Sequence, residues 1–180
     1  FGTDVDTVYV ASGEEKAYAD ALTGSALAGS QDAPVLLTRP DRVDQVTKDA
    51  LASLKPKKVV VLGGPAAVSD AVYAELGGTE RLAGSDRYGT SAAVAAQFAK
   101  DPNRALVASG LDYPDALTGG AWAGANDAPL VLTRKDRLPA ASKDALDALS
   151  PQDVAIIGGT AAVVQSVEDQ LNELLGGWVN

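Results

Sequence analysis

The chain has 180 residues and a formal net charge of −9, and it contains no cysteine, histidine or methionine. Without histidine there is no Ser-His-Asp triad, imidazole base or His-ligated metal, and without cysteine there is no thiol nucleophile, disulfide or Cys-type zinc site. The acidic charge argues against a general nucleic-acid binder. No apolar run reaches the roughly 18 residues of a membrane span. We therefore expect no metal, cofactor, nucleic acid partner or membrane span.

Two copies of one unit make up the chain. Residues 20–76 align without a gap to residues 115–171 at an offset of 95, and 30 of the 57 aligned positions are identical. Upstream, Val10–Gly13 matches Val107–Gly110 at an offset of 97. A period of this length indicates a tandem array of structural units.

The copies differ at their N-terminal ends. Residues 81–100 precede the second copy as RLAGSDRYGT and an alanine-rich stretch, which we call the leader, whereas the first copy has only residues 1–7 at that place. We expect a first module over residues 1–83 that lacks its leader helix, and a second over residues 84–180. Either this leader was removed from the first copy or a neighbouring module supplies it in the full protein.

Helices and strands alternate along the second copy. Alanine-rich or periodic stretches predict helices, and short apolar runs that end at glycine predict buried strands. Thr90 or Ser91 is expected to cap the leader helix. The expected helices are 91–99, 114–125, 138–149 and 163–174, and the expected strands are 105–109, 130–133, 154–157 and a short one at Trp178–Val179 that matches 81–83.

This alternation predicts βαβ units with a parallel sheet covered on both faces, and therefore an α/β fold with a short sheet in each copy. The loops that follow the strands should then lie together on one edge of the sheet, where α/β proteins bind ligands.

An aspartate follows the first of these strands in each copy. Asp20 and its counterpart Asp115 stand at or near the start of a predicted helix. Each carboxylate could cap the helix and complement its dipole, or it could contact a ligand.

Two arginines follow the second strand of each copy. They are Arg39 and Arg42 in the first copy and Arg134 and Arg137 in the second. A guanidinium suits bidentate recognition of carboxylate or phosphate. The alternative is that these arginines pair with the neighbouring Asp41 or Asp136 and join the modules.

A double glycine follows the third strand of each copy, as Gly63-Gly64 and Gly158-Gly159. A strand, two glycines and a helix are compatible with a backbone nest for an anion. They also fit a tight turn with no ligand, and neither the dinucleotide nor the P-loop pattern is present. A further motif, Asp86-Arg87-Tyr88, occurs once; its simplest interpretation is an ion pair within the module beside a packed tyrosine.

In combination and order, these residues resemble the cell wall binding repeat 2 family. The matching residues are Arg81, Gly84, Asp86-Arg87-Tyr88, Thr90, Gly110, Asp115-Ala116-Leu117, Ala128-Pro129-Leu130, Leu132-Thr133 and Gly158-Gly159. The resemblance covers nearly the whole chain, with fewer than two full repeats. It implies two tandem Rossmann-like or flavodoxin-like modules of the kind that hold surface-layer proteins, proteases and amidases to Gram-positive walls. In the clostridial members an anionic wall polymer is the ligand, and three repeats usually pack around a pseudo-threefold axis.

The resemblance leads to a first hypothesis, a secreted, non-catalytic module at the cell wall that anchors an attached effector such as an amidase or protease. Its partners would be an anionic wall polymer or a peptidoglycan-associated glycan, together with neighbouring repeats or a second copy of the chain. Because the net charge opposes an anionic ligand, local arginine clusters would have to bind it, and salt should weaken binding. The expected ligand-binding residues are Arg39, Arg42, Arg87, Arg134, Arg137, Asp20, Asp115, Gly63, Gly64, Gly158 and Gly159.

Two alternatives remain open. The strand-glycine-helix turns are compatible with a Rossmann-like domain for a small molecule or nucleotide, and Asp20 or Asp115 could make it a carboxylate-dependent hydrolase. The third hypothesis is a structural module that packs against its neighbours and binds no polymer.

Overall fold

The computed structural model describes residues 2–111 and 113–176 and contains two parallel sheets. The first copy forms a sheet of order β2-β1-β3-β4, and the second forms a sheet of order β6-β5-β7. This confirms the α/β fold with a short parallel sheet in each copy. The strands are β1 (Thr7–Ser12), β2 (Val35–Thr38), β3 (Lys58–Leu62), β4 (Glu80–Leu82), β5 (Ala105–Ser109), β6 (Leu130–Thr133) and β7 (Val154–Ile157).

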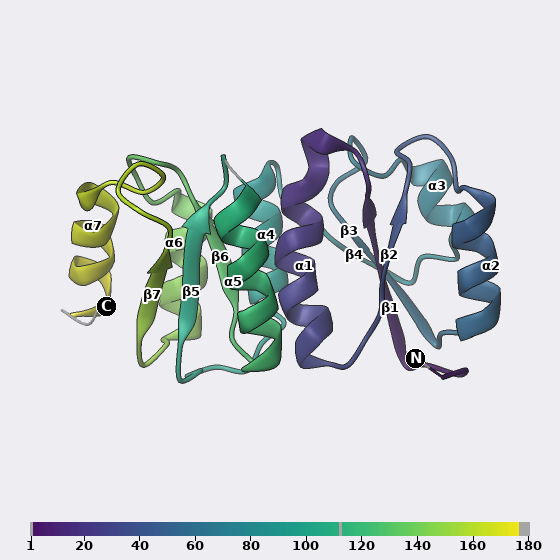
Figure 1. The fold of residues 1–180 in the computed structure, drawn as a ribbon, viewed down its shortest axis with the longest axis horizontal. Coiled ribbons are helices and arrows are strands. Elements are labelled where there is room, and N and C mark those ends of the chain that lie inside the picture. The colour runs from purple at the N-terminus through teal and green to yellow at the C-terminus, as the bar shows by residue number, and fades with distance from the viewer. Residues whose placement is uncertain (1, 112, 177–180) are drawn as a thin grey trace.

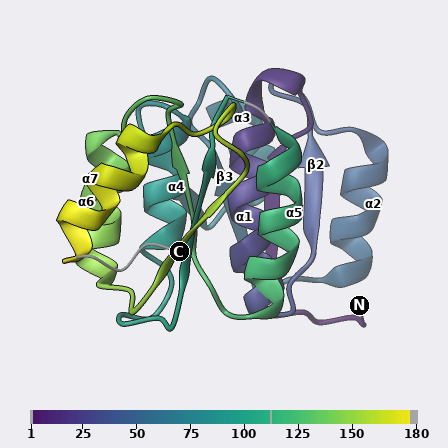
Figure 2. The same cartoon turned by 60° about the vertical axis from the view of Figure 1, so that its left-hand side comes forward.

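Helices cover both faces of both sheets (Figure 1). In Figures 1 and 2, α1, α4 and α5 lie between the sheets, α2 and α3 cover the outer face of the first sheet, and α6 and α7 cover the outer face of the second. The helices are α1 (Tyr18–Ser30), preceded by the short 3-10 helix Glu15–Ala17, α2 (Gln45–Leu54), α3 (Asp70–Glu75), α4 (Arg87–Ala95), α5 (Tyr113–Ala125), α6 (Ala140–Leu149) and α7 (Gln165–Leu175).

The leader helix begins earlier than the sequence indicated. α4 starts at Arg87, and its N-cap is Asp86, whose carboxylate accepts hydrogen bonds from the backbone N–H groups of Tyr88 (3.0 Å) and Gly89 (2.9 Å). The expectation that Thr90 or Ser91 caps this helix is therefore wrong. An aspartate four residues upstream satisfies the free N–H groups first, and both hydroxyl residues lie inside the helix.

The expected strands of the second copy are found at the predicted residues, as β5, β6 and β7. The strand expected at Trp178–Val179 lies outside the described residues. Its counterpart in the first copy is β4, which pairs with β3.

The two copies pack closely through α1 and α5. A β-carbon added at Gly29 would lie 2.9 Å from the Cα of Gly124, so only glycine lets the two backbones approach this closely. The small residues Gly120 and Gly124 of α5 thus let this helix pack closely against its counterpart α1. α4 packs against both copies, because Val94 joins the core of the first sheet and Ala95 joins the outer core of the second.

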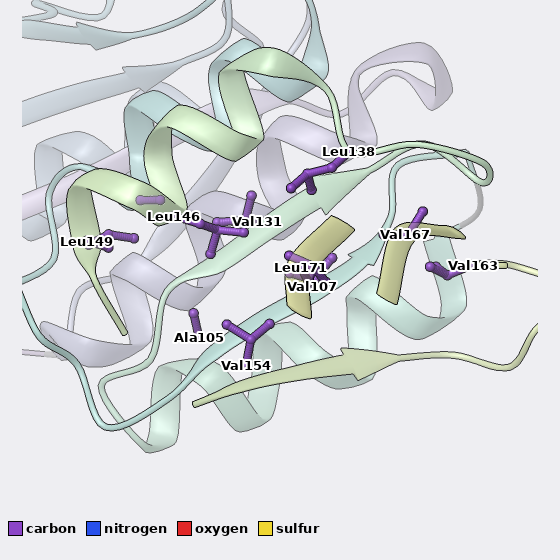
Figure 3. Close-up of a cluster of buried hydrophobic side chains, with 11 residues drawn as sticks. Ala105, Val107, Val131, Leu138, Leu146, Leu149, Val154, Val163, Val167 and Leu171 are labelled. Atoms are coloured by element: carbon purple, nitrogen blue, oxygen red, sulfur yellow. The ribbon is translucent and has the colours of Figure 1, made fainter. Parts of the chain in front are cut away.

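The outer core of the second copy is formed by aliphatic side chains from β5, β6, β7, α6 and α7 (Figure 3). Leu146 and Leu171 are completely buried there. Burial of each such side chain stabilises the fold by about 1.5–3 kcal/mol. This packing fixes the sheet and thereby the loops at its edge. No helix in the described part of the chain is long and apolar enough to cross a membrane.

Candidate functional site

All strands within each sheet are parallel, and their C-terminal ends lie at one edge of the molecule, uppermost in Figure 1. The arginine pairs follow β2 and β6, and the double glycines follow β3 and β7. The structure therefore brings the residues expected from the sequence to one edge, although it does not gather them into a single cluster.

In each copy the aspartate packs against the first glycine of the double-glycine turn. A β-carbon added at Gly63 would lie 2.4 Å from Oδ2 of Asp20, and one at Gly158 would lie 2.4 Å from Oδ2 of Asp115. Each turn thus has a carboxylate of its own copy beside it. Asp20 lies in the first turn of α1, but the N-cap position is Ala17 and no side chain caps this helix. The capping role considered for Asp20 is therefore wrong.

Asp20 is more buried than a free carboxylate usually is. Only 7% of the residue is exposed. Burial raises the pKa of its carboxyl to about 6, while a hydrogen bond with Thr90 and the charge of Arg87 oppose this rise. Thr90 and Arg87 both belong to α4, so the leader of the second copy covers the aspartate of the first.

This burial predicts a stability that depends on pH. Because the folded-state pKa of Asp20 lies above its ordinary value of 3.8, the folded chain binds the proton more tightly, and stability falls as pH rises through about 4 to 6. Asp20→Asn removes this titration. We expect wild type to lose about 2 kcal/mol relative to Asp20→Asn between pH 4 and pH 8, measured by urea unfolding. Parallel pH profiles for the two chains would contradict the assignment.

Three of the five expected arginines pair with neighbouring carboxylates. Arg39 Nε lies 2.9 Å from Asp44, Arg42 lies 3.5 Å from both Asp41 and Asp44, and Arg137 lies 3.3 Å from Asp136. The pairing with Asp41 or Asp136 that the sequence left as an alternative is thus present for Arg42 and Arg137, whereas Arg39 pairs with Asp44. Each of these pairs lies within one copy, so none of them joins the modules. All four pairs are exposed, and such pairs contribute only about 0–1 kcal/mol, so a charged ligand can compete for the guanidiniums.

The other two arginines belong to a cluster where the two copies meet. We call Tyr18, Arg87, Tyr88, Tyr113 and Arg134 the junction cluster. The Arg87 guanidinium donates to the Gly110 carbonyl and to the Tyr18 hydroxyl and lies 5.6 Å from the centre of the Tyr18 ring. The ion pair expected within Asp86-Arg87-Tyr88 does not form within the described residues, because Asp86 caps α4 while Arg87 reaches across to the first copy.

Tyrosines complete the junction cluster. The Tyr18 ring packs edge-on against Tyr113, with 5.8 Å between centroids, and its hydroxyl donates to the Leu111 carbonyl. Arg134 lies 4.9 Å from the centre of the Tyr88 ring. Burial raises the pKa of Tyr88, and the charges of Arg134 and Arg87 oppose the rise. The cluster therefore combines two cations with aromatic surface.

Sequence reasoning missed Tyr18 and Tyr113 as site residues. They occupy equivalent positions, since 113 minus 18 is the repeat offset of 95. Extending the alignment of the copies two residues upstream of Asp20 would have found the pair.

A cavity of about 450 Å³ opens beside Arg87. It is lined by residues of both copies, with Lys16 and Arg87 as cations and Glu14, Asp20 and Asp86 as anions. Mixed charge and hydroxyl groups suit a polar ligand with several hydrogen-bonding groups. In residues 2–111 and 113–176 no group of three or more carboxylates is placed to hold a metal ion.

Two α/β units that pack helix to helix, with an aromatic and cationic junction at their shared edge, define a tandem-repeat binding module. The chain belongs to the Cell wall binding domain 2 family, whose model matches residues 2–73 and 81–168. The resemblance noted from the sequence is therefore confirmed. The chain is a cell wall binding module, and its site of action is the cell wall or cell surface.

Curated relatives include two proteins of Bacillus subtilis strain 168. An amidase enhancer is 34% identical over 159 residues, which are 87% of this chain and 21% of that protein. The N-acetylmuramoyl-L-alanine amidase LytC is 30% identical over 158 residues, which are 86% of this chain and 32% of that protein. The chain thus spans about a fifth to a third of the length of these relatives.

Solved structures of Clostridium difficile cell wall proteins have the same fold. Cwp8 superposes with a TM-score of 0.86 at 26% identity, over 99% of this chain and 31% of Cwp8. Cwp6 superposes with a TM-score of 0.83 at 26% identity, over 98% of this chain and 29% of Cwp6.

Proposed function

We propose that this chain is a non-catalytic module that anchors a larger secreted protein to the Gram-positive wall by binding an anionic wall glycopolymer. Family membership supports the wall as the target. The amidase enhancer and the amidase LytC extend well beyond the region that this chain matches. This difference in length supports an effector attached to the module.

The junction cluster is the observation that carries the proposed ligand. Arg134 and Arg87 provide guanidiniums that suit phosphate or carboxylate groups. Tyr113 is 58% exposed and offers an aromatic face with a polar hydroxyl, which suits a sugar ring that has both apolar and hydroxyl faces. A glycopolymer with acidic groups matches both features.

The net charge of −9 opposes an anionic polymer at long range. Binding then depends on short-range contacts at the edge where the arginines lie, and each contact is screened by salt. Arg137 adds a further guanidinium, which forms an exposed pair with Asp136.

The combined Arg134→Ala and Arg137→Ala variant tests this proposal. We expect it to bind purified walls at least about tenfold more weakly, which corresponds to about 1.4 kcal/mol, when measured by co-sedimentation at fixed salt. Wild type should bind walls stripped of anionic polymers as weakly as the double variant binds intact walls.

The matched control is the combined Lys57→Ala and Lys58→Ala variant, which removes two positive charges at the opposite edge, where β3 begins. It should bind walls as wild type does. If both double variants weaken wall binding equally, the change in net charge alone explains the effect. If the arginine variant does not weaken wall binding, the assignment of Arg134 and Arg137 to the binding site is rejected.

Neighbouring repeats or a second copy of the chain are proposed as further partners. Their support is the apolar face of α5 and the preceding loop, where large side chains are exposed at Leu111, Tyr113, Leu117 and Trp122.

A further inference from the structure

The cavity beside Arg87 is large enough for a sugar-sized ligand. It lies at the upper edge in Figure 1, where β1 ends and α1 begins, and the start of α4 lines it from the second copy. Its volume of about 450 Å³ falls within the roughly 300–1,000 Å³ of small-ligand sites. The apolar part of its lining consists of small side chains, which leave this space open: Ala17, Ala19, Pro40, Ala66 and Ala67.

Charges of both signs line this cavity. The cations are Lys16 and Arg87, and the anions are Glu14, Asp20 and Asp86, so carboxylates outnumber cations. Within residues 2–111 and 113–176, Glu14, Lys16 and Asp20 form no ion pair, whereas most of the arginines that follow β2 and β6 pair with neighbouring aspartates. Unpaired charges of both signs around one cavity are groups that a ligand of complementary charge can satisfy.

Asp20 lacks a cation that fully offsets its burial. Burial raises the pKa of its carboxyl to about 6, although the charge of Arg87 and a hydrogen bond with Thr90 oppose the rise. The Arg87 guanidinium also donates to the Gly110 carbonyl and to the Tyr18 hydroxyl (3.4 Å), so it is shared among several acceptors. An ammonium group beside Asp20 would supply the missing positive charge, whereas a phosphate or carboxylate at the same place would be repelled.

Glu14 is the second carboxylate that is available to a ligand. Asp86 is already engaged, because its Oδ1 accepts hydrogen bonds from two backbone N–H groups at the start of α4. The Glu14 side chain is exposed, and its backbone N–H donates to Oγ of Ser12 (3.2 Å), which holds this segment at the end of β1. The exposed Lys16 belongs to the same segment and can turn toward an anionic group in the same cavity.

We propose that this cavity binds a zwitterionic unit of the wall glycopolymer, in which a free ammonium group lies a few bonds from a phosphate or carboxylate. The ammonium contacts Asp20 and Glu14, and the anionic group contacts Lys16 and Arg87. An amino sugar phosphate is the simplest unit with this chemistry. The inference rests on the proposed function for the identity of the polymer, but selectivity for a zwitterion is a property of the cavity alone.

A zwitterionic polymer also reduces the conflict between the net charge of −9 and an anionic ligand. Ammonium groups along the polymer lower its repulsion from the acidic module. A purely anionic polymer would instead depend on the arginines alone and would meet the carboxylates of this cavity without any compensating charge. The excess of carboxylates in the cavity therefore favours a ligand that carries both charges.

Glucosamine 6-phosphate is the probe for this selectivity. Glucose 6-phosphate, which lacks the ammonium, and glucosamine, which lacks the phosphate, are the matched controls. We expect the probe to bind at least about tenfold more tightly than either control in NMR titrations at pH 7 and constant ionic strength. The shifted amide signals should centre on Lys16, Asp20 and Thr90. Equal affinity for the two phosphates, or shifts centred elsewhere, would overturn the inference.

Glu14→Gln removes one proposed ammonium contact from an exposed side chain. It should lower the affinity for glucosamine 6-phosphate about three- to tenfold and leave that for glucose 6-phosphate unchanged. The matched control is Glu15→Gln, because Glu15 is the exposed neighbour of Glu14 and lies outside the lining of this cavity. It should bind both phosphates as wild type does. The inference fails if Glu14→Gln keeps the full preference for the amino sugar.

Asp20 gives this preference a pH dependence. The groups around it in the cavity are Arg87, Thr90, Asp86, Glu14 and Lys16. The Asp20 carboxyl must lose its proton before it pairs with an ammonium, and with a pKa of about 6 it is only about one-tenth ionised at pH 5. The ratio of the affinities for glucosamine 6-phosphate and glucose 6-phosphate should therefore rise about tenfold between pH 5 and pH 7, and Asp20→Asn should remove this rise. An equal rise in wild type and Asp20→Asn would contradict the contact with Asp20.

Acetylation of wall amines separates this inference from wall binding itself. It removes ammonium charges and leaves the acidic groups, so the walls become more anionic. We expect co-sedimentation with acetylated walls to be at least about threefold weaker than with untreated walls. Equal or stronger binding to acetylated walls would overturn the inference and leave the proposed function intact. If untreated walls do not bind the chain, the proposed function is rejected, and the sugar phosphate titrations still decide whether the cavity selects a zwitterion.

Discussion

Replacing Gly63 or Gly158 with alanine is expected to lower the free energy of unfolding by about 2–4 kcal/mol. Gly63 has φ of 97° and Gly158 has φ of 115°, which are conformations that other residues rarely adopt. The added β-carbon would also lie 2.4 Å from Oδ2 of the aspartate in the same copy. The variant must therefore strain the turn and displace a carboxylate that the fold has already buried or half-buried.

The second glycine of each pair provides the matched control. A β-carbon at Gly64 would have its nearest neighbour 3.9 Å away, one at Gly159 would have none within 4 Å, and neither residue has a left-handed φ. Gly64→Ala and Gly159→Ala should therefore change the unfolding free energy by about 0.5 kcal/mol or less in urea titrations. Equal effects at both glycines of a pair would show that the clash with the aspartate does not determine the turn.

The strands of the second copy could be predicted to the residue because each is a short apolar run that ends before glycine or at a hydroxyl residue. The bounds of Ala105–Ser109 and Val154–Ile157 are narrowly determined, because turn-forming residues flank each run on both sides. Helix starts were predicted less well. The start of α4 depends on which of Asp86, Thr90 and Ser91 reaches the free N–H groups, and that choice is one of geometry rather than composition.

The edge that carries the site followed from the topology, because residues after parallel strands must lie at one end of a sheet. The topology did not predict which residues each site residue contacts. Arg87 contacts Tyr18 because α4 packs against α1 of the first copy, and nothing local to Arg87 encodes this packing.

Equivalent residues of the two copies also have different surroundings, which a repeat alignment cannot show. Asp20 is buried beneath the leader of the second copy, whereas Asp115 is only half-buried in the described structure. Thr23 is likewise buried and its counterpart Thr118 is exposed. Identical residues are therefore covered in the first copy and more open in the second, because α4 lies over Asp20.

The turn that brings the leader onto the first copy leads to the second large effect, at Gly84. A β-carbon added there would lie 2.2 Å from the carbonyl carbon of Gly89 and 2.4 Å from its Cα. These are backbone atoms at the start of α4, so the clash cannot be relieved by a side-chain rotation. Gly84→Ala should lower the free energy of unfolding by about 3 kcal/mol.

The displacement should reach the edge that we propose for wall binding as well. Gly84 N donates to the Thr90 hydroxyl (3.2 Å), and Thr90 and Arg87 face Asp20 from the same helix. Moving this turn therefore loosens the Asp20 contact and the Arg87 bond to Tyr18 together. We expect Gly84→Ala to bind purified walls more weakly even at temperatures where circular dichroism shows it folded.

Ser85→Ala is the control for this prediction, because it changes the exposed neighbouring residue of the same turn without crowding Gly89. It should match wild type in both unfolding and wall binding. If Gly84→Ala unfolds like Ser85→Ala, the close approach of Gly84 to Gly89 does not hold the leader in place. If it is destabilised yet binds walls fully, the leader joins the copies without shaping the binding edge, and the ligand must contact residues outside the junction cluster.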